Sequence, residues 1–211
     1  MNKRLISRLL IAIIATGAFA MMTACSSDEG PAIDPIDDTQ AGEPTRLVLS
    51  SNESDMLEAL TDFAFDTNTA ISKQVSNQTG KPANYAYSPI NLEMALSLLA
   101  NGIEEPQRGT LVKILGLGNL ADLNTLNTKL YNYLYDKTNG VQVSLANSVW
   151  YDDAYSMSYG YTDNMGAMYG LECFKKDFTS AKTTDEINSW LAQKTHNMIS
   201  DVVKKDVLDN T

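Results

Sequence analysis

The sequence is poor in the residue types on which several classes of protein depend. Its 211 residues include two cysteines, Cys25 and Cys173, so a disulfide framework is excluded and we expect no disulfide. There is one histidine, His196, and there is no glycine-rich phosphate loop. We therefore expect neither an enzyme nor a bound cofactor or metal ion. Acidic residues outnumber basic ones by 26 to 16, so no basic surface is available for nucleic acid.

The few residues that could carry chemistry have simpler structural interpretations. A lone histidine near the end of a helix, as we expect for His196, is more often a partner of the helix dipole than a catalyst. Cys173 lies in a predicted strand without an evident histidine partner, which is typical of an inert buried thiol. Trp150 and Trp190 are interpreted as aromatic residues of the core or of an interface.

The first 24 residues have the architecture of an export signal. Lys3, Arg4 and Arg8 precede an apolar run that stops at Thr23. This run is shorter than the roughly 20 apolar residues that a membrane-spanning helix needs, and the polar sequence SSDE follows at residues 26–29. We therefore interpret residues 1–24 as a signal peptide rather than as a membrane span.

The residues before Cys25 indicate the kind of signal. Met22-Thr23-Ala24-Cys25 resembles the lipobox of bacterial lipoproteins, in which a larger apolar residue and two small residues precede a cysteine. This resemblance implies that the Cys25 thiol is lipidated and becomes the mature N-terminus, which would anchor an exported protein to the outer membrane of the cell envelope. The acidic run at 26–29 is similar to signals that direct some lipoproteins to the cell surface. Ordinary cleavage after Ala24, with an incidental cysteine or a buried thiol at position 25, is the alternative.

The predicted anchor is followed by a spacer and then by a folded domain. Residues 26–44 are rich in Ser, Asp, Gly, Pro and Thr and cannot bury enough apolar surface to fold. We predict a disordered tether over 25–44, with a typical span of roughly 25 Å as a flexible coil. The folded domain is predicted to cover residues 45–211.

The domain begins with a predicted helix and a short strand. Asp55 and Glu58 have the spacing of a capping pair, and apolar residues at helical spacing follow them until Gly80. The aromatic segment 84–87 predicts a strand. Ser88 then caps a helix with Pro89 in its first turn, and Gly102 is expected to end that helix in a left-handed conformation.

Further elements alternate in type along the remaining chain. The helix after Ser88 is apolar around most of its circumference, so we expect it to be covered on most sides. Thr183 and Glu186 have the spacing of a capping box for the last helix. The other predicted helices are 106–116, one that carries Leu123, Leu126, Leu130 and Leu134, 158–168 and 184–196; the predicted strands are 141–151 and 172–178.

Four blocks of this sequence, taken in order, resemble the serpin family of protease inhibitors. The blocks are NYAYSPINLEMALSLLANG at 84–102, Gly116-Leu117, LANSVW at 145–150, and Asp177-Phe178 followed by INSWLAQKTHNMI at 187–199. The resemblance implies an α+β fold with helices packed on a central β-sheet. It places Ser88, Pro89 and Asn91 in the shutter region, where the central sheet of the family parts. Serpins usually carry a second serine where Asn91 stands.

The same resemblance implies a function and a limit on it. In a serpin inhibitor, the target serine or cysteine protease cuts an exposed loop, which then inserts into the central sheet as a new strand. This chain stops at Thr211, before the C-terminal sheets and the reactive loop of the family. We therefore expect an incomplete serpin domain that does not inhibit by this route on its own. The alternative is a non-inhibitory surface lipoprotein that uses a serpin-derived platform to bind another protein through its open strand edges.

Overall fold

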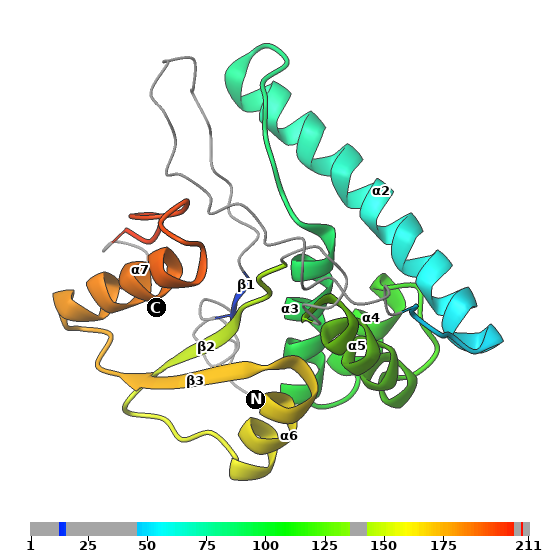
Figure 1. Ribbon diagram of the computed structural model, residues 1–211. Helices are drawn as coiled ribbons and strands as arrows, with labels where there is room; N and C mark the ends of the chain where they lie inside the picture. Colours follow the sequence, from blue (N-terminus) through cyan, green and yellow to red (C-terminus); the bar gives the residue numbers. More distant parts are fainter. Residues whose placement is uncertain (1–12, 16–45, 136–142, 205–207, 209–211) are drawn as a thin grey trace, which may run out of the picture.

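The computed structural model describes residues 13–15, 46–135, 143–204 and 208. These residues form an α+β arrangement in which helices pack on a three-stranded sheet (Figure 1). The elements are β1 Ile13–Ala15, α2 Ser51–Thr79, α3 Pro89–Gly102, α4 Gln107–Ile114, α5 Leu120–Tyr135, β2 Asn147–Asp152, α6 Tyr159–Tyr169, β3 Leu171–Lys176 and α7 Ala181–Lys194.

The sheet has the strand order β1-β2-β3. Strands β2 and β3 are parallel, with Asn147 opposite Leu171 and Asp152 opposite Lys176. A parallel pair needs a crossover connection, and α6 supplies it. Strand β1 pairs with β2 in the antiparallel direction, but only along the first half of β2, from Asn147 to Val149.

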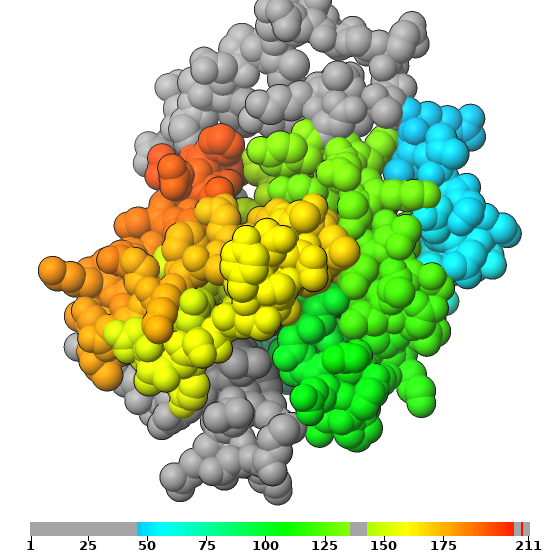
Figure 2. Space-filling view, turned by 90° about the horizontal axis from the view of Figure 1, so that it is seen from below, coloured from blue at the N-terminus to red at the C-terminus, as the bar shows by residue number. Residues whose placement is uncertain are grey.

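Side chains of the sheet alternate between two hydrophobic clusters. Val149 and Leu171 belong to the larger cluster, which the buried residues of α2, α3, α5 and α6 complete. Trp150 belongs to a second cluster with Ile187 and Trp190 of α7. Because successive residues of a strand point to opposite faces, the sheet separates α7 from the other helices. Figure 2 shows α6 in yellow between the green helices and the orange β3–α7 region.

The predicted starts of two helices are wrong, because a different residue caps each of them. Helix α2 begins at Ser51, because Ser50 and Glu53 form the capping box, rather than Asp55 and Glu58. The backbone N–H of Ser50 donates to Glu53 Oε2 over 2.7 Å, and that of Glu53 donates to Ser50 Oγ over 3.3 Å. Helix α7 likewise begins three residues before Thr184, with Ser180 as its N-cap.

Two further predictions are corrected by the structure. Gly102 remains helical, and the chain leaves α3 through the extended residue Ile103, so no left-handed cap forms there. Segment 84–87 is not a strand. It runs back along α2 (Figure 1) and is held there by hydroxyl groups, because Tyr87 donates to the Ala64 carbonyl over 2.7 Å and Tyr85 donates to Asn68 Oδ1 over 2.7 Å.

The other predicted elements are confirmed with shifted ends. Strand β2 begins at Asn147, although alternation of apolar residues starts at 141; residues 141 and 142 lie outside the described part. Of the predicted signal peptide and tether, the structure describes only residues 13–15, and the boundaries at 24 and 44 stay predictions. No described helix combines the length and apolar character that crossing a bilayer requires.

Candidate functional site

The start of α3 is built as its sequence predicts. Ser88 Oγ accepts a hydrogen bond of 3.4 Å from the backbone N–H of Asn91, and Pro89 occupies the first turn. Asn91 is buried, with 6% of its surface exposed. The three residues that the resemblance placed in the shutter region therefore lie together at one helix end. Their role in opening a sheet stays a prediction.

Helix α3 is covered on several sides, as its all-round apolar sequence predicts. It contacts α2, α4, α5, α6 and both strands β1 and β2. Met94, Leu98 and Ala100 have at most 1% of their surface exposed. A helix with apolar residues on all sides is stable only where other elements cover those sides, and α3 is covered in this way.

Within this apolar helix lies a buried carboxylate that the sequence interpretation missed. Glu93 has 3% of its surface exposed. Its Oε1 accepts hydrogen bonds from Ser97 Oγ over 2.6 Å and from Asn127 Nδ2 over 2.7 Å. Burial raises the pKa of Glu93 to about 7, although the hydrogen bonds from Ser97 and Asn127 oppose this rise.

The polar cluster continues from Glu93 into α5 and α6. The Tyr169 hydroxyl accepts a hydrogen bond of 3.3 Å from Asn127 and donates one of 2.6 Å to Asn124 Oδ1. The side-chain amides of Asn101 and Asn124 form a reciprocal pair, with both bonds 2.9 Å long. Burial raises the pKa of Tyr169 well above its usual range, so this hydroxyl stays protonated. The cluster thus connects α3, α5 and α6 through directional bonds.

Asn147 links the same cluster of helices to the sheet. It opens β2, and its Nδ2 donates a hydrogen bond of 2.8 Å to the backbone carbonyl of Tyr169. The same group lies 3.9 Å from Met94 Sδ. With 3% of its surface exposed, Asn147 is buried on the face of β2 that also carries Val149. It fixes the strand against the end of α6.

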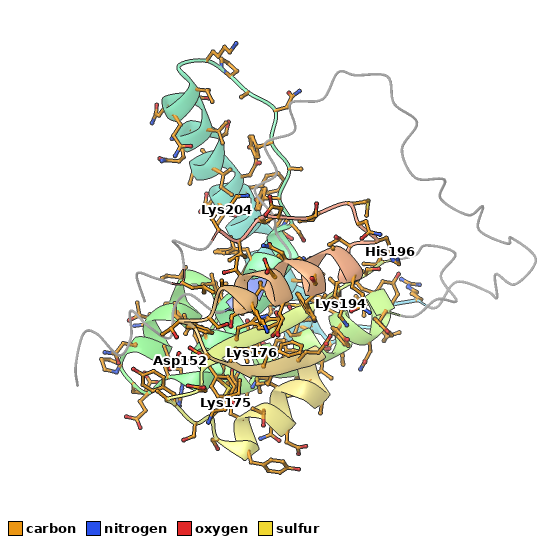
Figure 3. All side chains as sticks on the ribbon, turned by 90° about the vertical axis from the view of Figure 1, so that its left-hand side faces the viewer. Asp152, Lys175, Lys176, Lys194, His196 and Lys204 are labelled. Atoms are coloured by element: carbon orange, nitrogen blue, oxygen red, sulfur yellow. The ribbon has the colours of Figure 1, made fainter. Side chains whose placement is uncertain are left out.

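Helix α7 covers the opposite face of the sheet through aromatic contacts. Trp150 of β2 and Phe174 of β3 stack with ring centroids 4.1 Å apart, and Trp190 of α7 meets Trp150 edge-on at 6.4 Å. Glu172 accepts a hydrogen bond from Trp190 Nε1 over 3.2 Å and pairs with Lys194. Figure 3 shows α7 crossing in front of the sheet, with Lys194 and His196 near its C-terminal end and Lys176 on β3.

The remaining predicted site residues are not brought together by the fold. Cys25, the predicted lipidation site, lies outside the described residues. Cys173 is a half-buried free thiol whose pKa is raised by burial. Among the described residues, no group of three or more His, Cys, Asp or Glu side chains could hold a metal ion. The missed residues carried a signal: Glu93 interrupts an apolar helix, and Asn127 interrupts the leucine stripe of α5.

Comparisons with known proteins match most of the chain to one family. The family model described as "Serpin (serine protease inhibitor)" matches residues 58–211. Serpin-Z2B of Triticum aestivum is 32% identical over 156 residues, covering 72% of this chain and 38% of the relative. Serpin-Z10 of Arabidopsis thaliana is 26% identical over 68% of this chain and 38% of its own. The chain therefore spans about two fifths of the length of the curated relatives it matches.

Solved structures show the same fold. The crystal structure of native protease nexin-1 with heparin matches with a TM-score of 0.65 at 20% identity, covering 74% of this chain and 40% of that one. Human glycosylated kallistatin matches with a TM-score of 0.63 at 20% identity, over 71% of this chain and 41% of its own. At this level of identity, the likeness concerns the fold alone.

Proposed function

Because the chain belongs to the serpin family, we propose that the protein inhibits serine or cysteine proteases while it is anchored to a membrane. The family match over residues 58–211 is the observation that carries the proposal. The protein acts as an inhibitor rather than as a catalyst. The matched residues supply two strands of the sheet and the helices behind it, and inhibition by loop insertion also requires the three fifths of the family domain that the match does not cover.

The edge of β2 supports the proposal that the rest of the inhibitor domain packs against the residues described here. Among the described residues, Trp150, Tyr151 and Asp152 have a strand neighbour only on the β3 side. Strand β1, which pairs with the first half of this edge, lies within the predicted signal peptide. If that peptide is removed on export, β2 has no strand neighbour on this side among the described residues. Unpaired strand edges readily accept another strand, so further strands of the inhibitor domain add here.

The inhibitory function is tested on the native protein extracted from its source membrane. The protein is mixed with a panel of serine and cysteine proteases, and the products are analysed by denaturing electrophoresis and intact mass. We expect a covalent complex with at least one protease that survives denaturant, and a native mass well above the 23.1 kDa of this chain. Inhibition would be disproved if the native mass equalled that of this chain without its signal peptide and with the added lipid, and no complex formed.

Anchoring is proposed to occur through a lipidated Cys25. Several acyl chains on one residue hold a protein stably to a bilayer, whereas one chain binds marginally. The protein is expressed in a bacterium that processes lipoproteins and is labelled with an alkyne fatty acid. We expect label in the parent and in Cys173→Ser, which retains Cys25, and none in Cys25→Ser. Equal labelling of the two serine variants would refute the anchor.

A second candidate function is non-inhibitory binding of another protein chain at the same edge. The second half of β2 favours it, because no described strand pairs with it on the β1 side and strand addition needs no reactive loop. A partner retained by the native protein, together with absence of any denaturant-stable protease complex, would favour binding over inhibition.

A further inference from the structure

Two buried oxygen atoms at the contact between α3 and α5 lack a hydrogen-bond donor. They are Glu93 Oε2 and Asn127 Oδ1, and neither has a hydrogen-bond partner among the described residues. Both belong to side chains that already meet, because Asn127 Nδ2 donates to Glu93 Oε1 over 2.7 Å. A buried acceptor without a donor is costly, because it has lost its hydrogen bonds to water without replacement. One pair of side chains thus carries this cost twice.

The donors of the polar groups around this pair are directed at other acceptors. Ser97 Oγ donates to Glu93 Oε1 over 2.6 Å. The Tyr169 hydroxyl donates to Asn124 Oδ1, also over 2.6 Å. The side-chain amides of Asn101 and Asn124 donate to each other. Among the described residues, no donor therefore serves either unpaired oxygen while Glu93 is charged.

We propose that Glu93 and Asn127 form a proton-operated latch between α3 and α5, in which a proton on Glu93 Oε2 is donated to Asn127 Oδ1. A protonated carboxyl group has one O–H donor and still accepts at its other oxygen, so the bond from Asn127 Nδ2 to Oε1 is kept. The acid and the amide then exchange two hydrogen bonds, and one proton gives a partner to both unpaired oxygens. The terminal torsions of Glu and Asn are broad, which lets the two planar groups align by rotation.

Burial sets the pH at which this latch works. Glu93 has 3% of its surface exposed, and burial raises its pKa to about 7. Below this pH the carboxyl group holds its proton and the latch is closed. Above it the donor is lost and a charge remains in the core, so the attachment of α5 to α3 weakens.

The charged groups of the elements packed against α3 do not neutralise this carboxyl group. Lys129 of α5 pairs with Glu53 of α2, and Arg108 of α4 donates to a backbone carbonyl. Tyr161 and Tyr169 of α6 stay protonated, because burial raises the pKa of both. Strand β1 has no titratable side chain, and those of β2 lie in its second half. The other charged side chains of α2, α4, α5 and α6 are exposed: Asp55, Glu58, Asp62, Asp66, Lys73, Lys113, Asp122 and Asp163.

Glu93→Gln copies the closed latch. The new NH2 group takes the place of Oε2 and donates to Asn127 Oδ1 at every pH, while the remaining oxygen still accepts from Asn127 Nδ2. The competing explanation is a charged Glu93 whose Oε2 is satisfied by a buried water molecule. Glu93→Gln would then weaken charge-assisted hydrogen bonds and destabilise the fold. The two explanations predict opposite signs for the same substitution.

The test is thermal unfolding of the full chain at about pH 4 and about pH 8. At the higher pH, Glu93→Gln should unfold at least about 5 °C above the parent, whereas at the lower pH the two should unfold together. Glu53→Gln is the matched control, because Glu53 is also buried but both of its oxygens have donors, from Lys129 and from the backbone N–H of Ser50. It should unfold below the parent at the higher pH.

Two further measurements locate the proton and the latch. At about pH 6, the infrared band of a protonated carboxyl group should be present in the parent and in Glu53→Gln and absent from Glu93→Gln. Hydrogen exchange of the α5 amides, corrected for its intrinsic dependence on pH, should accelerate about tenfold between about pH 6 and about pH 8 in the parent and stay constant in Glu93→Gln.

Four results would each overturn the proposal. Glu93→Gln fails to fold, or it unfolds below the parent at the higher pH. The infrared band is as strong in Glu93→Gln as in the parent. The corrected exchange of α5 in the parent does not depend on pH.

Discussion

Asn127 of α5 donates a hydrogen bond of 2.7 Å to Oε1 of Glu93 on α3, across a separation of 34 residues in the chain. Both side chains are buried, and Ser97 donates to the same oxygen. A hydrogen bond to a charged acceptor in a buried site is stronger than one between neutral groups, and an unmade one is correspondingly costly. The packing of these two helices therefore depends on a polar contact inside an apolar core.

The protonation of Glu93 should make stability depend on pH. Its pKa rises from 4.5 to about 7 on folding, so the folded state binds more protons between these values. Stability is therefore fully present below about pH 4.5 and is lost as pH rises through about 7, by about 3 kcal/mol. Urea unfolding between about pH 4 and about pH 8 measures this slope. Glu93→Gln should flatten the slope, whereas Glu58→Gln should preserve it; equal slopes in all three proteins would contradict the prediction.

Removal of the Asn127 amide should destabilise the protein. Asn127→Leu keeps a similar volume but takes donors away from Glu93 and Tyr169. We expect a loss of about 2 to 3 kcal/mol in the free energy of unfolding, because the partners stay buried. Asn164→Leu, at an exposed position of α6, is the control and should change stability by less than about 0.5 kcal/mol. A double-mutant cycle with Glu93→Gln should be non-additive, and additive losses would exclude coupling.

Gly170 should not tolerate a side chain. It adopts φ of +61° at the C-cap of α6, and a Cβ atom there would collide with the ring and hydroxyl of Tyr131. Gly80 has a similar φ of +68° but open space around it. We expect Gly80→Ala to cost about 1 kcal/mol through backbone strain alone, and Gly170→Ala to cost about 1 to 3 kcal/mol more. Equal losses in thermal unfolding would show that Tyr131 moves away without cost.

The ion pair between Glu53 and Lys129 should protect the fold against acid. Lys129 Nζ lies 2.6 Å from Glu53 Oε1 and connects α5 to the start of α2. Its hydrogen bond, together with that from the Ser50 backbone, lowers the pKa of Glu53 from 4.5 to about 2. The resulting stability is present above about pH 4.5 and is lost as pH falls towards 2. Lys129→Gln should raise the midpoint pH of acid unfolding, whereas Lys113→Gln, at an exposed position, should not.

Local signals predicted the elements better than they predicted where each begins. The Ser88 cap and the proline after it fixed the start of α3, because both act within one turn. The cap of α2 was misplaced because Ser50 and Glu53 have the same kind of spacing as Asp55 and Glu58. Segment 84–87 has strand-forming residues, yet its tyrosines bind α2 instead of a neighbouring strand. The strand propensity of a residue reflects how well its side chain packs against a neighbouring strand. The local sequence does not show whether such a neighbouring strand is present.

The sequence by itself determined the family, the α+β class and the burial of α3, since these follow from ordered motifs and from periodicity along the chain. Only the tertiary structure decided that Glu93, Asn127 and Tyr169 meet, and that one oxygen of Glu93 is buried without a hydrogen-bond partner among the described residues. Periodicity identifies the buried face of a helix but not the helix that will cover it. Contacts between residues separated by 34 and 42 positions depend on how whole elements pack.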